Sequence, residues 1–171
     1  VQGKTAGIVG LGRIGKTIAK RCEAFNLKIA YTGRNKQAGI AHAYYADALS
    51  LARDVDILIV AAPGGENTRG LISRAVLEAL GPEGTVVNIA RGSVIDETAM
   101  IEALKTGKLG AAGLDVFDKE PQVPAELLAL DNVVVQPHVG SATHPTRTAM
   151  GQLVIDNLAA FFAGKPLLTP V

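Results

Sequence analysis

Three glycines near the start of the chain, Gly10, Gly12 and Gly15, leave few folds open to it. They follow the short apolar run Thr5–Val9 and open a segment whose apolar residues recur every three or four positions, at Ile14, Ile18, Cys22 and Phe25. That spacing places the four side chains on one face of a helix. A strand, a G-x-G-x-x-G turn and a helix, in this order, predict the first unit of a dinucleotide-binding fold.

Each glycine of this turn has a physical task in such a fold. Gly10 permits the tight turn after the strand, Gly12 lets a pyrophosphate approach the backbone, and Gly15 lets the helix pack close to the strand. Free amides at the helix N-terminus then face the anion. The alternative is a glycine turn that only connects a strand to a helix. The first interpretation predicts cofactor contacts at Gly10, Gly12, Arg13, Ile14 and Gly15.

The rest of the chain alternates short apolar runs with longer amphipathic segments, which is typical of an α/β fold with a parallel sheet. Asp56–Ala62 is apolar without alternation, as expected of a central strand covered on both faces. Further strands are predicted at Leu27–Thr32, Ala43–Ala46, Thr85–Ile89, Gly110–Leu114 and Asn132–Val135. Helices are predicted to end near Arg53, to span Ser73–Leu80 and Asp96–Lys105, and to run over about 143–163. We therefore expect one domain over residues 1–171, a doubly wound parallel sheet of the Rossmann-like type.

The charge balance and the cysteine count exclude several classes of protein. The formal net charge is +1, which leaves no electrostatic footprint for nucleic acid or an anionic membrane. No apolar run approaches the roughly 20 residues needed to cross a bilayer, and no signal peptide is recognisable at Val1. The single cysteine, Cys22, excludes an internal disulfide and a cysteine-based metal cage. We expect a cytoplasmic protein in a reducing compartment, without a metal site.

The end of the second predicted strand bears on the choice of cofactor. Dinucleotide folds usually place an acid there to accept from the adenosine ribose hydroxyls. In this chain no acid occurs in residues 30–36: Thr32 holds that position, and Gly33 and Arg34 follow. A guanidinium can hold a 2′-phosphate that an acid would repel. The segment predicts cofactor contacts at Thr32, Gly33 and Arg34 and a preference for NADP, with NAD open and a solvated loop charge at Arg34 as the alternative.

Polar groups also follow the later predicted strands. Arg91 follows Thr85–Ile89, Asp115 and then Glu120 follow Gly110–Leu114, and His138 follows Asn132–Val135. In an open α/β sheet, ligands bind outside the carboxyl ends of the strands. Taken alone, each of these residues is as well explained as an ordinary surface or loop group. Together they predict an acid–base set around one crevice.

Three longer motifs carry these residues and resemble the D-2-hydroxyacid dehydrogenases. Residues 88–97 (NIARGSVIDE) are similar to the family's signature around its substrate arginine. Residues 113–121 (GLDVFDKEP) are similar to the segment with its catalytic acid, and residues 137–143 (PHVGSAT) to the segment with its histidine. With the glycine turn, the resemblance extends over essentially the whole chain in the family's order.

The resemblance implies a role for each residue. Arg91 would bind the carboxylate and keto oxygen of a small 2-keto acid, and His138 would protonate that oxygen as hydride arrives, or remove the proton in reverse. Glu120 would hydrogen-bond the other imidazole nitrogen and stabilise the protonated ring. Asp115 would accept from the nicotinamide carboxamide. Further cofactor contacts are expected at Ala62, Pro63, Thr68, Ile89, Ala90 and Gly140.

The resemblance also predicts what accompanies this chain. The family's N-terminal substrate-binding domain has no counterpart here, so we expect the chain to be the cofactor domain of a longer protein and inactive by itself. Family members pair through their cofactor domains, which implies a homodimer.

The resemblance leaves three interpretations of the function. The stretch from Tyr31 to Arg34 particularly resembles the glyoxylate/hydroxypyruvate reductases, whose substrates are small 2-keto acids. The alternative from another class is a non-catalytic dinucleotide-sensing module like the family's corepressors, which resemble the enzymes at the three site residues. Formate dehydrogenases are disfavoured because they carry Gln where Glu120 stands.

Overall fold

The computed structural model describes residues 1–170. The chain divides into two compact units: the first spans Val1–Pro137, and the second begins at His138. Each unit is described by itself.

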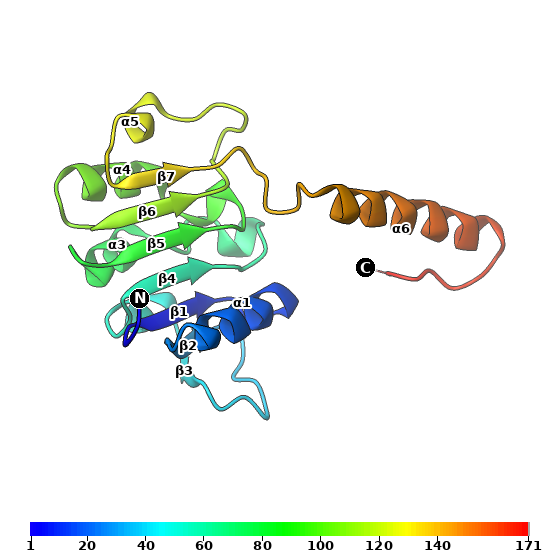
Figure 1. Ribbon diagram of the computed structural model, residues 1–171, viewed down its shortest axis with the longest axis horizontal. Helices are drawn as coiled ribbons and strands as arrows, with labels where there is room; N and C mark the ends of the chain where they lie inside the picture. Colours follow the sequence, from blue (N-terminus) through cyan, green and yellow to red (C-terminus); the bar gives the residue numbers. More distant parts are fainter. Residues whose placement is uncertain (171) are drawn as a thin grey trace. The chain divides into compact units, whose positions relative to one another are not determined.

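The first unit is built on a seven-stranded sheet in which every neighbouring pair of strands is parallel. Its order is β3-β2-β1-β4-β5-β6-β7, so the chain reverses direction across the sheet between β1 and β4. This confirms the predicted doubly wound parallel sheet (Figure 1). The strands are β1 Thr5–Val9, β2 Lys28–Thr32, β3 Ala43–Tyr45, β4 Ile57–Val60, β5 Thr85–Asn88, β6 Ala111–Leu114 and β7 Val133–Val135.

Helices pack on both faces of this sheet, as the two separate clusters of buried side chains show. Alternate residues along β4 point to opposite clusters: Leu58 and Val60 to one, Ile59 to the other. The larger cluster includes α2, α3 and α4, which pack one against the next, and the smaller one includes α1. The helices of this unit are α1 Arg13–Ala24, α2 Ala48–Ala52, α3 Arg74–Leu80, α4 Glu97–Lys105 and α5 Ala125–Leu128, with 3-10 turns η1 Glu66–Thr68 and η2 Gly92–Val94.

The buried face of α1 differs from the predicted one. Ile14 is 62 % exposed and Phe25, at the C-cap, is 67 % exposed, whereas Gly15 and Ala19 are buried. The helix lies so close to β1 that only small residues fit at the contact. Ile14 precedes Gly15 by one position, or about 100° of rotation, and therefore points away from the sheet. Ile18 and Cys22 are partly buried beside the small residues, as the apolar spacing predicted.

Polar residues occupy the N-caps of three helices, near the positions where the sequence predicts these helices to start. The Asp96 side chain accepts a hydrogen bond from the Ala99 amide at the start of α4, and Thr143 accepts from the Thr146 amide. Ser73 occupies the N-cap of α3, but its side chain makes no capping hydrogen bond. The short helix α5 was not predicted, because four residues show no helical period.

The second unit is dominated by α6, which spans His144–Phe162. The Asn157 side chain accepts hydrogen bonds from the backbone amides of Leu168 and Thr169, at 3.0 Å and 3.2 Å, and holds the segment after the helix against it. Within residues 1–170, no helix has the length and apolar character that a membrane span requires.

Candidate functional site

The predicted cofactor residues of the first unit lie at one edge of its sheet. All seven strands are parallel, so their carboxyl ends share that edge. Backbone hydrogen bonds carry the alignment into the loops: the Gly10 amide donates to Thr32 O, the Ile89 amide to Val60 O, and the Asp115 amide to Asn88 O. The reversal between β1 and β4 is the switch point at which doubly wound sheets bind their ligands.

The glycine turn has the shape that a pyrophosphate requires. Gly10 has φ 95°, and a Cβ atom there would lie 2.8 Å from the Ala62 backbone. A Cβ on Gly15 would overlap the Gly10 carbonyl oxygen. By contrast, a Cβ on Gly12 would meet nothing within 4 Å, and no side chain caps the first turn of α1. Open space at Gly12 and uncapped amides at Arg13 and Ile14 therefore fit a bound dinucleotide phosphate.

This geometry separates the roles of two glycines. We expect Gly15→Ala to lower the free energy of unfolding by about 1–3 kcal/mol, because the methyl group forces α1 away from β1. Gly12→Ala should change that free energy by less than about 0.5 kcal/mol. It should weaken dinucleotide binding by more than about tenfold, because the methyl group fills the phosphate space. Urea denaturation and cofactor titration of both variants test this pair; equal effects of the two changes on stability would contradict it.

The loop after β2 places a cation where the sequence predicted one. Thr32 is the last residue of the strand and is buried, with 5 % of its surface exposed, while Arg34 is exposed. The Tyr44 hydroxyl donates to the Gly33 carbonyl oxygen at 3.3 Å. Among residues 1–170, no carboxylate forms an ion pair with Arg34 or Lys36. The two cations are therefore available to an anionic ligand.

On the other side of the switch point, the predicted residue Thr68 joins the two ends of the loop after β4 by hydrogen bonds. The Thr68 hydroxyl donates to the Pro63 carbonyl oxygen at 2.7 Å and lies 3.2 Å from that of Gly65. Ala62, at the start of this loop, is buried against Gly10. The predicted contacts Ala62, Pro63 and Thr68 thus belong to one compact turn beside the glycine turn.

The backbone of Arg91 is held by Asn88, a residue for which the sequence predicts no role. Asn88 is 1 % exposed; its side-chain NH₂ donates to the Arg91 carbonyl oxygen and its side-chain oxygen accepts from the Ala90 amide, both at 3.0 Å. The Arg91 Nη1 donates to the Ala90 carbonyl oxygen at 2.6 Å. A Cβ on Gly64 would come within 2.6 Å of the Arg91 side chain, so Gly64 makes room for it. In the sequence, Asn88 is an amide at the end of an apolar strand and the first residue of the motif 88–97, and neither position indicates its contact with Arg91.

The loop after β6 carries Asp115 and Glu120 and packs on the Arg91 segment. Glu120 Oε1 accepts from the Phe117 amide at 3.1 Å. The next amide, that of Asp118, donates to Glu97 Oε2 at 3.1 Å. A Cβ on Gly92 would overlap the backbone of Phe117 and Asp118. The structure therefore brings together Arg91 and the Glu120 loop, as their places at neighbouring strand ends predict.

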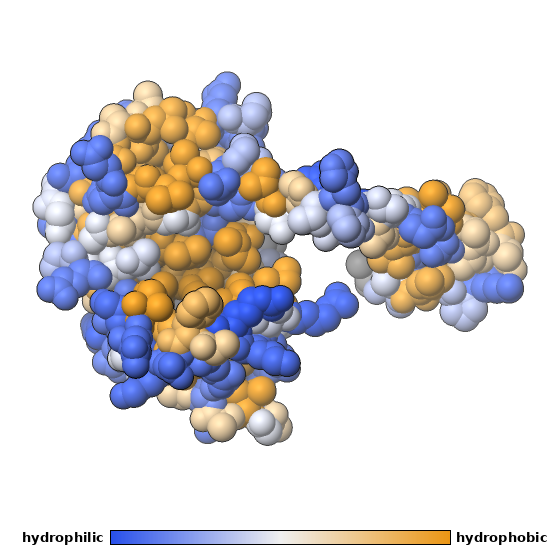
Figure 2. Space-filling model, in the orientation of Figure 1, coloured by the Kyte–Doolittle hydropathy of each residue, from blue (hydrophilic) through white to orange (hydrophobic). Residues whose placement is uncertain are grey.

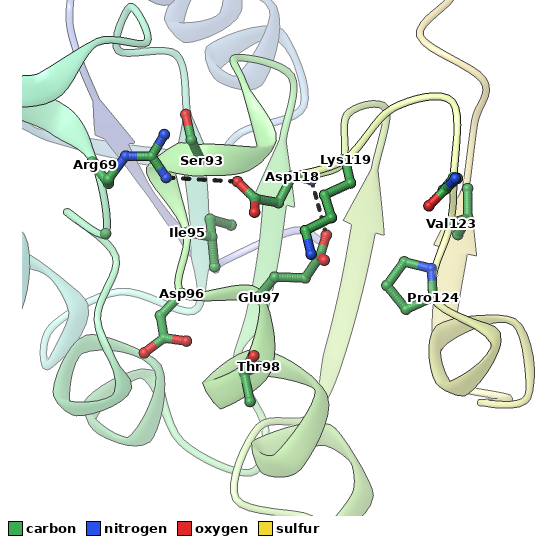
Figure 3. A pocket seen from close by; sticks show the side chains of 12 residues that line it. Arg69, Ser93, Ile95, Asp96, Glu97, Thr98, Asp118, Lys119, Val123 and Pro124 are labelled. Carbon is green, nitrogen blue, oxygen red and sulfur yellow. Dashed lines mark hydrogen bonds and ion pairs between the residues drawn. The ribbon is translucent and has the colours of Figure 1, made fainter.

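A cavity of about 460 Å³ lies beside these residues rather than among them. Side chains from the start of α4 and from the Glu120 loop line it, as Figure 3 shows. Arg69 points toward Asp118, with 3.8 Å between the charged atoms, and Glu97 lies below. Arg91, Glu120 and the glycine turn do not line it. Both acidic and basic side chains line this cavity, so its charge does not indicate a site for the predicted 2-keto acid substrate.

His138 and Gly140 belong to the second unit, whereas Arg91 and Glu120 belong to the first. His138 has φ 54°, a left-handed conformation that is uncommon for a residue with a side chain. Such residues are found preferentially at functional sites, where their strain of about 1–3 kcal/mol is maintained by the surroundings. Among the described non-glycine residues, His138 shares a positive φ with Asn26, which ends the turn after α1 and has no proposed role.

Comparison with known proteins gives consistent results. Residues 1–140 match the family model for the D-isomer specific 2-hydroxyacid dehydrogenase, NAD binding domain. The chain is 53 % identical over 170 residues to glyoxylate/hydroxypyruvate reductase A of Arabidopsis thaliana and 52 % identical over 170 residues to hydroxyphenylpyruvate reductase of Plectranthus scutellarioides. These matches cover 99 % of the chain and 54 % of each relative.

A solved structure extends the likeness to three dimensions. It is the NADPH-dependent glyoxylate/hydroxypyruvate reductase of Sinorhizobium meliloti in complex with NADP and malonate, with a TM-score of 0.98 and 47 % identity. The match covers 100 % of this chain and 54 % of that one. The chain thus spans about half the length of the relatives it matches.

Proposed function

Because this chain belongs to the D-isomer specific 2-hydroxyacid dehydrogenase family, we propose that it is the cofactor-binding domain of a longer oxidoreductase of small 2-keto and 2-hydroxy acids. The observation that carries the proposal is the carboxyl edge of the sheet. There an open, uncapped glycine turn and a clamped arginine, Arg91, follow strands of one parallel sheet. The first fits a dinucleotide phosphate and the second fits a carboxylate.

The proposed cofactor is NADP, with NAD as the weaker ligand. Residues of the glycine turn hold the pyrophosphate, the loop of Thr32, Gly33 and Arg34 meets the adenosine ribose, and the turn from Ala62 to Thr68 lies beside it. Ile89, Ala90, Asp115 and Gly140 complete the proposed contacts. The absence of an acid after β2 and the unpaired Arg34 support this assignment, and the S. meliloti relative is an NADPH-dependent enzyme.

A bound nicotinamide cofactor supplies the hydride, and residues of this chain handle the substrate and the proton. Arg91 binds the substrate carboxylate through its fixed fork of donors. His138 gives a proton to the keto oxygen during reduction and takes it back during oxidation. Glu120 orients the imidazole and stabilises its protonated form. Asn88 holds the Arg91 backbone and thereby limits the directions in which the guanidinium can point.

Glyoxylate and hydroxypyruvate are the proposed substrates because the named reductases among the relatives act on them. The full-length protein is expected to oxidise NADPH in the presence of glyoxylate. The decrease in NADPH absorbance measures this reaction. Hydroxyphenylpyruvate is the second compound to assay, because a relative of nearly equal identity is named for it. Cofactor binding without turnover of any of the three would favour the corepressor-type module instead.

A homodimer in a reducing cytoplasm is also proposed. Exposed apolar side chains on α6 support association of this helix with another protein surface. They form two stripes, one of Met150, Val154, Leu158 and Phe161 and the other of Ile155 and Phe162. Figure 2 shows this apolar surface along the helix. The single cysteine supports the compartment. Sedimentation equilibrium of the full-length protein tests the first proposal, since a monomer at micromolar concentration would contradict it.

A further inference from the structure

The loop between β2 and β3 is held by side chains outside the predicted cofactor contacts. The backbone amide of Gln37 donates to the hydroxyl of Tyr31, a fully buried residue of β2, at 2.9 Å. The side-chain amide of Gln37 donates to the Leu11 carbonyl oxygen at 2.7 Å. Leu11 lies inside the glycine turn, between Gly10 and Gly12. One residue therefore ties the loop of Arg34 to the turn that fits the pyrophosphate.

This link matters because the other contacts of the loop lie at its ends, where the Tyr44 hydroxyl donates to the Gly33 carbonyl oxygen and Ile40 packs against the smaller core cluster. Residues 33–42 form neither helix nor strand, and Arg34, Asn35 and Lys36 are all exposed. A long cationic side chain holds an anion well only if its backbone is placed correctly, since ordering a free loop costs conformational entropy at the moment of binding. The pyrophosphate and the 2′-position of one dinucleotide are joined through a single ribose, which limits the distance between them. A bond between turn and loop therefore presets the spacing at which the two phosphate groups are met.

We propose that Gln37 is a positioning residue for cofactor choice: its hydrogen bonds to Leu11 and Tyr31 hold the loop of Arg34 and Lys36 in place to receive a 2′-phosphate. The inference rests on the proposed preference for NADP and extends it to a residue that touches neither the phosphate nor the nicotinamide. Gln37 acts only through the loop, so its loss should reduce discrimination between cofactors and leave the binding of the common adenosine 5′-phosphate part intact.

Two fragments of the cofactors test this without any turnover. Adenosine 2′,5′-bisphosphate and adenosine 5′-monophosphate are titrated calorimetrically into the full-length protein, and the ratio of their affinities is compared among variants. The wild type is expected to prefer the bisphosphate by about tenfold or more. Gln37→Leu, which keeps the bulk but removes the donor, should reduce that ratio by about two- to tenfold. Its affinity for the monophosphate should stay within about twofold of wild type, with an unchanged melting temperature.

Three further variants sharpen the result. Tyr31→Phe removes the hydroxyl that accepts from the Gln37 amide and should lower the ratio in the same direction; it decides the matter alone if Gln37→Leu does not fold. Asn35→Ala, in the same exposed loop, is the matched control and should leave the ratio unchanged. In an Arg34→Ala background, Gln37→Leu should cause a smaller further loss than in the wild type, because only Lys36 is left for it to position.

The outcomes distinguish the inference from the function on which it rests. A wild type that binds the two fragments equally overturns the proposed preference for NADP and this inference with it. A wild type that prefers the bisphosphate, with a ratio unchanged in Gln37→Leu and Tyr31→Phe, overturns only the role of Gln37. Equal losses for both fragments would also overturn it, since Gln37 would then support the fold of the turn and not the choice of cofactor.

Discussion

Replacing His138 with alanine in the full-length protein is expected to lower kcat for glyoxylate reduction by about 10²–10⁴-fold, the range for loss of a general acid or base. The affinity for NADPH should change little, because the His138 side chain is not among the proposed cofactor contacts. Stopped-flow and steady-state rates give kcat, and calorimetry gives the affinity.

The backbone at His138 calls for a second variant. With φ 54°, alanine is strained at this position, whereas asparagine adopts the left-handed region more readily. His138→Asn should therefore keep the fold and the cofactor affinity of the wild type while losing as much activity as His138→Ala. If His138→Asn retained wild-type kcat, the imidazole would not be the proton donor. If only the alanine variant lost activity, the backbone conformation rather than the side chain would be responsible.

The choice of cofactor should depend on Arg34. Arg34→Ala is expected to weaken NADPH binding by about ten- to a hundredfold, because one charge-assisted contact to the 2′-phosphate is lost. NADH binding should change by less than about twofold, since that cofactor has a hydroxyl at the same place. Titration of both cofactors into the wild type and the variant measures the effect. A preference for NADPH that survives the change would assign Arg34 to the solvated surface.

Two controls separate charge from shape in this experiment. Higher salt should shrink the wild-type preference, because Arg34 is exposed and its attraction for the phosphate is screened. Thr32→Asp should reverse the preference by repelling the phosphate and accepting from the ribose hydroxyls. Thr32 is buried, so the melting temperature of this variant must be measured beside its affinities. A salt-independent preference would mean that packing and not charge selects the cofactor.

Much of the fold could be predicted because its signals are local. The run Asp56–Ala62 predicted a central strand, and β4 lies in the middle of the sheet. The failure on α1 has a physical cause. Apolar spacing identified a helix and its partly buried residues Ile18 and Cys22, but the closest contact with β1 is made by Gly15 and Ala19, where side-chain size and not hydrophobicity decides.

Residues of the candidate site could be predicted where they stand in recognisable motifs. Contacts between residues far apart in the sequence could not be predicted. Arg91 and Glu120 stand in motifs, and their loops do pack together. Nothing in the order of residues indicated that Asn88 would clamp the Arg91 backbone, because a buried amide at a strand end has several possible partners. The cavity beside α4 was not predicted either, since its walls come from residues 69–70, 93–98 and 118–124, which are far apart in the sequence.

The sequence by itself determined the type and order of the elements, the glycine turn, the uncharged end of β2 and the family. These depend on periodicity, turn chemistry and motifs within about ten residues of one another. Only the tertiary structure decided which groups meet across the sheet edge: Gly10 with Ala62, Gly92 with the Glu120 loop, and Gln37 with Leu11, 26 residues apart. Crossover connections bring such pairs together, and a contact made that way depends on the path of the whole chain rather than on any local pattern.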